Sequence, residues 1–309
     1  MQLSFNWEGG PQNPCWAQAA TARALALAAL FALAVLPPPL RAQEKPYFVT
    51  YDHHMEEPGD LEVAFSPVVG VPKTARTFTG STLEIGYGAK GWWTTELYLD
   101  GQTTRGDSTI FTGYRWENRF RPLLGEHWIN PVLYVEFSNL NGADKSLKEV
   151  VGLDSEKDFA KANGELRRER KRELETKLIL SSNFRGWNVA ENLIAEKNLD
   201  GGAWELGYAV GLSRPLALAA SPRECTFCRE NFRVGAEFYG GLGTVHSFTL
   251  SDTSHYIAPV LLWELPSGAT LRFSPGFGLT GESHRVLLRF GVTYEIEGFG
   301  RRMAKLFHQ

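Results

Sequence analysis

The stretch HRVLLRFGVTYEIEG, residues His284–Gly298, decides the fold because its apolar and polar side chains alternate. Successive side chains of a β-strand point to opposite faces, so this alternation predicts a strand with one apolar and one polar face. The apolar row consists of Val286, Leu288, Phe290, Val292, Tyr294 and Ile296. The opposite row, which is mainly polar, consists of Arg285, Leu287, Arg289, Gly291, Thr293 and Glu295.

The same alternation recurs along the chain, for example in GWWTTELYLD (residues 91–100) and AWELGYAVGL (residues 203–212). It predicts about twelve strands, an even number that suits a single-chain antiparallel barrel. Their lengths of about 9 to 11 residues fit tilted strands that cross a bilayer and exceed the usual length in soluble sheets. The twelve segments are Leu61–Val69, Ser81–Ala89, Gly91–Asp100, Thr109–Arg119, Trp128–Ser138, Leu174–Ser182, Trp187–Glu196, Ala203–Leu212, Phe232–Gly240, Tyr256–Leu265, Thr270–Leu279 and His284–Gly298.

The connections between these segments differ in length, and long and short ones broadly alternate. The long polar insertion of residues 139–170 is expected on the outer side of a membrane, with the N-terminus on the periplasmic side. Residues 214–230 break the alternation and are expected to form a small periplasmic excursion with one helical turn. The segment Trp187–Glu196 separates apolar from polar residues less cleanly than the others and predicts either a bulge or a different strand register there.

An export signal is indicated near the start of the chain. Residues 24–36 form an apolar run that follows Arg23 and ends at three prolines, residues 37–39. A spanning helix needs about 20 apolar residues, so this shorter run indicates a secretory signal, with a buried N-terminal helix as the alternative. We expect residues 1–42 to be a signal peptide that is removed, residues 43–59 a periplasmic N-terminal segment, residues 60–299 the barrel and residues 300–309 a C-terminal tail.

Charge and cysteine content narrow the range of partners. The 32 Lys+Arg and 35 Asp+Glu residues give a net charge of -3, which disfavours nucleic-acid binding.

Beyond the signal, Cys225 and Cys228 form a C-T-F-C pair, for which a disulfide is expected in an oxidising compartment. The alternatives are a copper or zinc site that combines this pair with His53, His54 and Met55, and a pair of free thiols. The histidines are expected to lie in an exposed entry segment, and no cofactor is expected.

The eight residues Arg289–Ile296, RFGVTYEI, carry the pattern polar, any, glycine, any, any, aromatic, any, hydrophobic. This pattern resembles the C-terminal signal of Gram-negative outer-membrane β-barrel proteins, and the chain is similar in general plan to transporter-type barrels of that group. The resemblance implies the cell outer membrane, contact with its lipids and recognition by the barrel-assembly machinery. The chain continues past the motif from Glu297 to Gln309, whereas members of that group typically end near it.

The predicted fold class is therefore all-β, a closed antiparallel transmembrane β-barrel of about twelve strands. A soluble sandwich or lipocalin-like barrel is the alternative, because it also alternates apolar and polar residues. Glycines on the polar side of the strands favour the membrane barrel, since small residues leave room in a crowded lumen. These glycines are Gly86, Gly88, Gly207, Gly211, Gly235, Gly276 and Gly278.

If the apolar rows face lipid, charged residues of both signs line the lumen, either as a structural lining or as a solute path. The candidates are Glu84, Glu96, Arg115, Glu136, Glu205, Arg233, Glu237, Arg272 and Arg289. Tryptophans and tyrosines near strand ends are expected to form interfacial girdles. The run RRERKRELE, residues 167–175, is expected to contact lipopolysaccharide phosphates or solvent.

The function expected from these features is passive or facilitated transport of a small solute. Two alternatives are a lipid-acting hydrolase and a closed structural or metal-handling barrel. A hydrolase would draw on His246, Ser254 or His255, but no partner that would orient a catalytic histidine is identifiable and no hydrolase motif is present. We therefore predict no catalytic residues and no enzymatic activity.

Overall fold

A computed structural model describes residues 45–219 and 225–307, which lie in a compact unit of residues 42–309. The expected signal peptide lies outside the described residues. Among the described residues, no helix combines the length and the apolarity that crossing a membrane would require.

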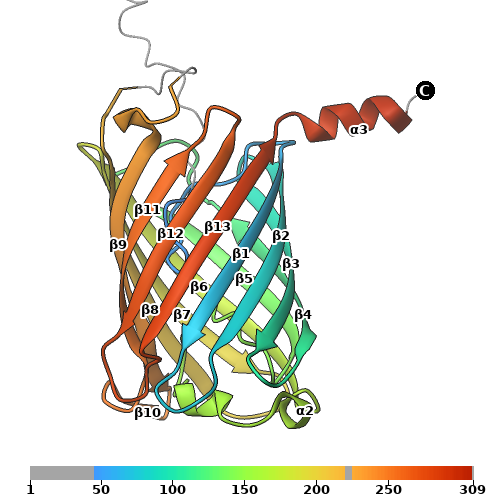
Figure 1. Cartoon of the computed structure of the whole chain (residues 1–309). Helices are drawn as coiled ribbons and strands as arrows, with labels where there is room; N and C mark the ends of the chain where they lie inside the picture. Colours follow the sequence, from blue (N-terminus) through green and yellow to red (C-terminus); the bar gives the residue numbers. More distant parts are fainter. Residues whose placement is uncertain (1–44, 220–224, 308–309) are drawn as a thin grey trace, which may run out of the picture. The chain divides into compact units, whose positions relative to one another are not determined.

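Twelve antiparallel strands form a closed ring (Figure 1). Each strand pairs with its neighbours in sequence, β9 pairs with β8 and β11, and β13 closes the ring onto β1. A short strand, β10 (Ser247–Phe248), pairs with β9 outside the ring. The ring consists of β1 (Leu61–Val71), β2 (Phe78–Lys90), β3 (Trp93–Thr104), β4 (Thr109–Phe120), β5 (Asn130–Asn141), β6 (Arg170–Phe184), β7 (Trp187–Asn198), β8 (Trp204–Pro215), β9 (Phe232–Thr244), β11 (His255–Glu264), β12 (Ala269–Gly278) and β13 (Val286–Ile296).

The two faces of the ring have inverted polarity relative to a soluble protein. Leu133 and Phe238 point outward and are 51% and 42% exposed, whereas Glu117 and Arg119 point inward and are 0% exposed. An apolar exterior around a charged interior is the pattern of a membrane barrel. The predicted fold class is confirmed, and the soluble alternative is wrong.

The two ends of the barrel differ in their connections. One end, here called the terminal end, carries the start of β1 and the C-terminal helix α3 (Phe299–Phe307), which extends sideways from the rim (Figure 1). Short turns join β2 to β3, β6 to β7 and β11 to β12 at this end. The opposite end, here called the loop end, carries the long connection between β5 and β6, which contains η1 (Glu156–Phe159) and α2 (Asn163–Leu166).

Several local predictions need correction. The bulge predicted in β7 is wrong, because this strand keeps a continuous register with both neighbours, Ala190 and Asn192 facing inward and Glu191 outward. Register shifts instead occur in the β2–β3, β3–β4 and β8–β9 pairs. Between β8 and β9, the described residues include one short helical turn, η2 (Arg229–Asn231).

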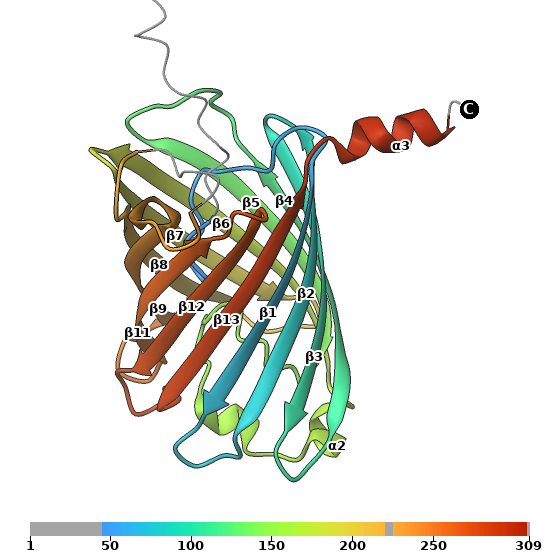
Figure 2. The same cartoon turned by 45° about the horizontal axis from the view of Figure 1, so that its top comes forward.

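Two chain segments enter the lumen, and both were expected outside it. Residues 45–60, here called the N-terminal insert, enter from the terminal end (Figure 2), so the expected periplasmic placement of residues 43–59 does not hold for its buried part. Residues 142–169, here called the loop insert, fold back from the loop end, with Lys145 and Val150 buried. An eight-stranded ring can be filled by side chains alone. The wider ring of this chain admits whole backbone segments.

Candidate solute pathway in the barrel lumen

The N-terminal insert is anchored by Glu237, which points inward from β9 and is 1% exposed. Its carboxylate accepts three hydrogen bonds from consecutive backbone N–H groups: Phe48 at 3.1 Å, Val49 at 2.9 Å and Thr50 at 2.7 Å. Hydrogen bonds to an ionised acceptor are stronger than those between neutral groups. One wall carboxylate therefore fixes the middle of the insert.

Polar side chains of other strands hold the rest of this insert. Asn192 of β7 accepts from the backbone N–H of Tyr51 at 2.6 Å and donates to the Tyr51 carbonyl at 2.8 Å. Arg272 of β12 donates to the carbonyl of Tyr47 at 3.0 Å. The phenol of Tyr47 donates to the side-chain oxygen of Asn188 at 2.8 Å. The insert thus satisfies its buried backbone groups on the barrel wall, as buried polar groups require.

The loop insert contacts the wall mainly through ion pairs. Arg115 of β4 pairs with Asp144 at 3.3 Å and Glu149 at 3.6 Å, both from the insert. Lys177 of β6 pairs with Glu149 at 2.5 Å. Arg289 of β13 donates to the backbone carbonyl of Leu147. Basic wall residues therefore hold this insert through its acidic side chains and its backbone.

Inward-facing glycines provide space for the insert backbones. A Cβ atom added at Gly80 would lie 2.1 Å from the carbonyl oxygen of Lys145 in the loop insert. A Cβ atom added at Gly88 would lie 2.0 Å from the carbonyl oxygen of Glu57 in the N-terminal insert. Both distances are far shorter than van der Waals contact, so any larger residue would displace an insert.

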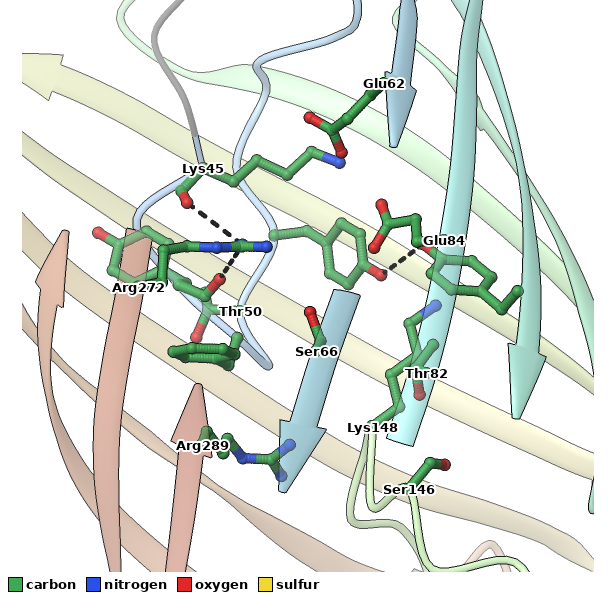
Figure 3. Close-up of a pocket in the computed structure, with 14 residues that line it drawn as sticks. Lys45, Thr50, Glu62, Ser66, Thr82, Glu84, Ser146, Lys148, Arg272 and Arg289 are labelled. Atoms are coloured by element: carbon green, nitrogen blue, oxygen red, sulfur yellow. Dashed lines mark hydrogen bonds between the residues drawn. The ribbon is translucent and has the colours of Figure 1, made fainter. Parts of the chain in front are cut away.

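The two inserts meet near the middle of the barrel, where Val49 and Val150 belong to one apolar cluster. Beside them lies a cavity of about 60 Å³, lined by Lys45, Thr50 and Lys148 from the inserts and by Glu84 and other wall residues (Figure 3). At about 30 Å³ per water molecule, that volume holds about two. The inserts thus leave this small space, lined by charged and polar side chains, beside them.

The structure places the predicted lining residues on the inward side of the wall. Six of them, Glu96, Arg115, Glu136, Glu237, Arg272 and Arg289, contact an insert. Glu84 lines the cavity, Arg233 is buried, and Glu205 is half-buried beside Gly152 at the loop end. Sequence reasoning missed their partners in the inserts, because it placed both segments outside the lumen.

His53, expected to be exposed, is 1% exposed and lies in a hydrogen-bonded chain. Its Nδ1 atom is 2.5 Å from Ser181 Oγ, and its Nε2 atom is 2.9 Å from Glu126 Oε2. Burial and the neighbouring His54 lower the pKa of His53, so the ring is neutral near pH 7. Ser181 is 3% exposed and also accepts the backbone N–H of His53, so this chain anchors the insert to β6.

The cysteine pair and the histidines lie in different arrangements. Cys225 and Cys228 are joined by a disulfide in the connection between β8 and β9. Within the described residues, no three His, Cys, Asp or Glu side chains converge as metal ligands would. The proposed joint soft-metal site is therefore not formed.

The residues considered for a hydrolase also lack the necessary contacts. The ring of His255 contacts the hydroxyl of Tyr208 at 2.9 Å and that of Thr253 at 2.8 Å. Ser254 donates to the carbonyls of Asp154 at 2.8 Å and Glu282 at 3.0 Å. A nucleophilic serine must instead donate to a histidine base.

Solved structures of other barrel proteins have a similar architecture. No family model matches the chain, and no curated protein matches its sequence. Among solved structures, the COG4313 outer membrane channel from Pseudomonas putida F1 has a TM-score of 0.52 at 11% identity, over 82% of this chain and 100% of that chain. LpxR from Salmonella typhimurium has a TM-score of 0.40 at 9% identity, over 75% of this chain and 99% of that chain. OprD from Pseudomonas aeruginosa has a TM-score of 0.35 at 10% identity, over 79% of this chain and 68% of that chain.

The closed ring, its apolar exterior and its charged interior define the class of protein. The chain has the fold of Gram-negative outer-membrane β-barrels and is located in the cell outer membrane.

Proposed function

We propose that this protein is a channel for a small hydrophilic solute, closed in the present structure by its two inserts. The observation that carries the proposal is the way in which the inserts are held. Ion pairs and hydrogen bonds to charged wall residues fix both segments inside a polar lumen. Once a segment withdraws, the polar groups on both sides of these contacts can bond to water or solute instead, so the inserts can leave while the β-ladder stays intact.

The orientation follows from the connections. Outer-membrane barrels place short turns in the periplasm and long loops outside the cell. We therefore assign the terminal end to the periplasm and the loop end to the exterior. In this orientation the basic residues at the start of β6, Arg170 and Arg172, lie on the outer side and are exposed, which supports contact with lipopolysaccharide phosphates.

The lining also suggests a charge preference. Acidic residues outnumber basic ones along the inward rows of the sequence. On β3 to β5, the four buried carboxylates of Glu96, Asp100, Glu117 and Glu136 outnumber the two buried arginines, Arg115 and Arg119. A passage lined by carboxylates concentrates cations and excludes anions. We therefore expect the open channel to favour cations, which the reversal potential in a potassium chloride gradient measures.

Planar bilayer recordings test the proposal. Refolded protein, identified as a closed barrel by heat-modifiable gel mobility, is compared with a variant that lacks residues 43–56. We expect rare, small openings from the full protein and stable, larger openings from the variant. If neither protein conducts ions or admits small solutes into liposomes, the channel proposal is wrong.

A further inference from the structure

Lys148 of the loop insert occupies a cage of three tyrosine rings. Its Nζ atom lies 3.5 Å from the ring centre of Tyr98, 5.7 Å from that of Tyr51 and 5.8 Å from that of Tyr134. A cation within about 6 Å of an aromatic ring centre is attracted by the ring's electron-rich face. The side chain of Lys148 is 11% exposed, so little water weakens this attraction.

The same ammonium group is also held by oxygen atoms. It donates to the carboxylates of Glu117 and Glu136, both at 2.9 Å, and to the hydroxyl of Tyr134 at 3.4 Å. A lysine ammonium has three donors, so these three acceptors can use all of its N–H bonds. Although burial lowers the pKa of Lys148, the two carboxylates hold it well above its usual value.

Most of the cage belongs to the barrel wall. Tyr98, Glu117 and the pair Tyr134 and Glu136 come from the adjacent strands β3, β4 and β5. Their orientations are fixed by wall contacts: Tyr98 donates to Glu117 at 2.7 Å, and Tyr134 donates to Glu136 at 2.8 Å. The cage is therefore organised independently of the loop insert.

Removal of Lys148 would leave the cage electrostatically unbalanced. Glu117 retains Arg119 at 3.0 Å, but among the ion pairs of the described residues Glu136 pairs with Lys148 alone. Lys177 of β6 also faces the cage, with its Nζ atom 4.1 Å from the ring centre of Tyr134, but it is paired with Glu149 and Glu175. A buried carboxylate that loses its direct ion-pair partner is costly, so the position vacated by Lys148 would attract another cation.

We propose that this cage is the binding site for a primary ammonium group of the transported solute, and that Lys148 occupies it as an intramolecular substitute while the channel is closed. The inference rests on the proposed channel function and specifies its substrate class as small primary amines. Three oxygen acceptors favour R–NH₃⁺ over a quaternary ammonium, which has no N–H donor. Opening would then be coupled to solute binding, because the solute competes with Lys148 for the same groups.

Chemical rescue of Lys148→Met tests this inference. Methionine keeps much of the side-chain length but removes the charge, and n-butylammonium reproduces the missing four-carbon amine. We expect n-butylammonium to bind the refolded variant measurably by calorimetry and to raise its thermal unfolding temperature, while wild-type protein shows about tenfold weaker binding or none. Lys145→Met is the matched control, because Lys145 also lies over two aromatic rings, those of Phe78 and Phe159, but its hydrogen bonds go to the neutral side chains of Thr104 and Asn163.

The ligand controls are n-butanol and n-butyltrimethylammonium, which we expect to bind at least about tenfold more weakly to Lys148→Met. Adding Glu136→Gln to that variant should weaken n-butylammonium binding by a similar factor. If Lys148→Met does not give a heat-modifiable barrel, Lys148→Gln replaces it.

Ion conductance separates the two proposals. A variant that conducts ions but neither binds nor is blocked by n-butylammonium would overturn the cage and leave the channel standing. Equal binding by Lys148→Met and Lys145→Met would also overturn the cage. Selective binding by Lys148→Met in a protein that never conducts would support the cage as an ammonium site and refute transport through it.

Discussion

Replacing Glu237 with alanine should release the N-terminal insert from the barrel wall. The substitution removes the shared acceptor of three consecutive backbone N–H groups, those of Phe48, Val49 and Thr50, at 3.1, 2.9 and 2.7 Å. Val49 is 0% exposed and Thr50 is 3% exposed, so bulk water does not reach these N–H groups in the closed position of the insert.

The free-energy cost of Glu237→Ala in the closed state follows from the number of backbone N–H groups that lose their acceptor. Leaving a buried N–H without an acceptor costs about 1 to 3 kcal/mol, so three such groups cost about 3 to 9 kcal/mol in the closed state. A loss of about 3 kcal/mol already shifts the ratio of closed to open states by more than about a hundredfold. Glu237→Gln keeps one acceptor oxygen, so we expect an effect of roughly one third of that size on the free-energy scale.

Thiol accessibility measures this release. In a Thr50→Cys background, Cys225 and Cys228 are bound in their disulfide, so position 50 supplies the reactive thiol among the described residues. We expect a maleimide to modify this thiol about a hundredfold faster when Glu237 is replaced by alanine. Glu173→Ala, an acidic residue at the loop end of β6, is the control. Unchanged reactivity in a heat-modifiable Glu237→Ala barrel would refute the reasoning.

Three further perturbations have definite expected outcomes. Burial raises the pKa of Asp154 in the loop insert to about 7. The closed position of the insert is therefore favoured at low pH, where Asp154 is protonated, and this stabilisation is lost as the pH rises from about 4 to 7. Channel openings should be more frequent at pH 8 than at pH 5, and Asp154→Asn should remove this difference. Gly80→Val should displace the loop insert at a cost of about 1 to 3 kcal/mol and increase trypsin cleavage within it, whereas Gly164→Ala, with open space around its Cβ position, should not. Replacing Cys225 and Cys228 with serine should leave conductance unchanged and lower unfolding stability by at most about 2 kcal/mol, as thermal unfolding in micelles would show, because the disulfide closes only a very short loop.

The ring itself was predictable because its side chains face two different environments. Each predicted segment overlaps one observed strand, and in β13 the apolar row of Val292 and Tyr294 points outward while Arg289 points inward. Period-two alternation records this contrast directly in the sequence. Irregularities are less visible: the regular strand β7 shows weak alternation because Ile194 faces the lumen and Glu191 faces outward.

The contents of the lumen could not be predicted in the same way. The N-terminal insert has no regular secondary structure of its own, and its backbone partners, such as Glu237 and Asn192, lie more than a hundred residues away. The loop insert is polar, as an external loop would be. A signal was nevertheless present in the glycines of the inward rows, since Gly88 leaves room for the backbone of the N-terminal insert.

The two inserts are coupled through the groups that they share. Glu117 of β4 accepts from the hydroxyl of Tyr51 in the N-terminal insert at 3.0 Å and from Lys148 in the loop insert at 2.9 Å. The two segments also contact each other directly, because Val49 and Val150 lie in one apolar cluster and the Lys148 Nζ atom lies 5.7 Å from the ring centre of Tyr51. Withdrawal of either segment would remove these contacts and expose apolar surface of the other to water. The inserts therefore favour each other's closed positions, and a ligand that displaces one lowers the free energy required to release the other.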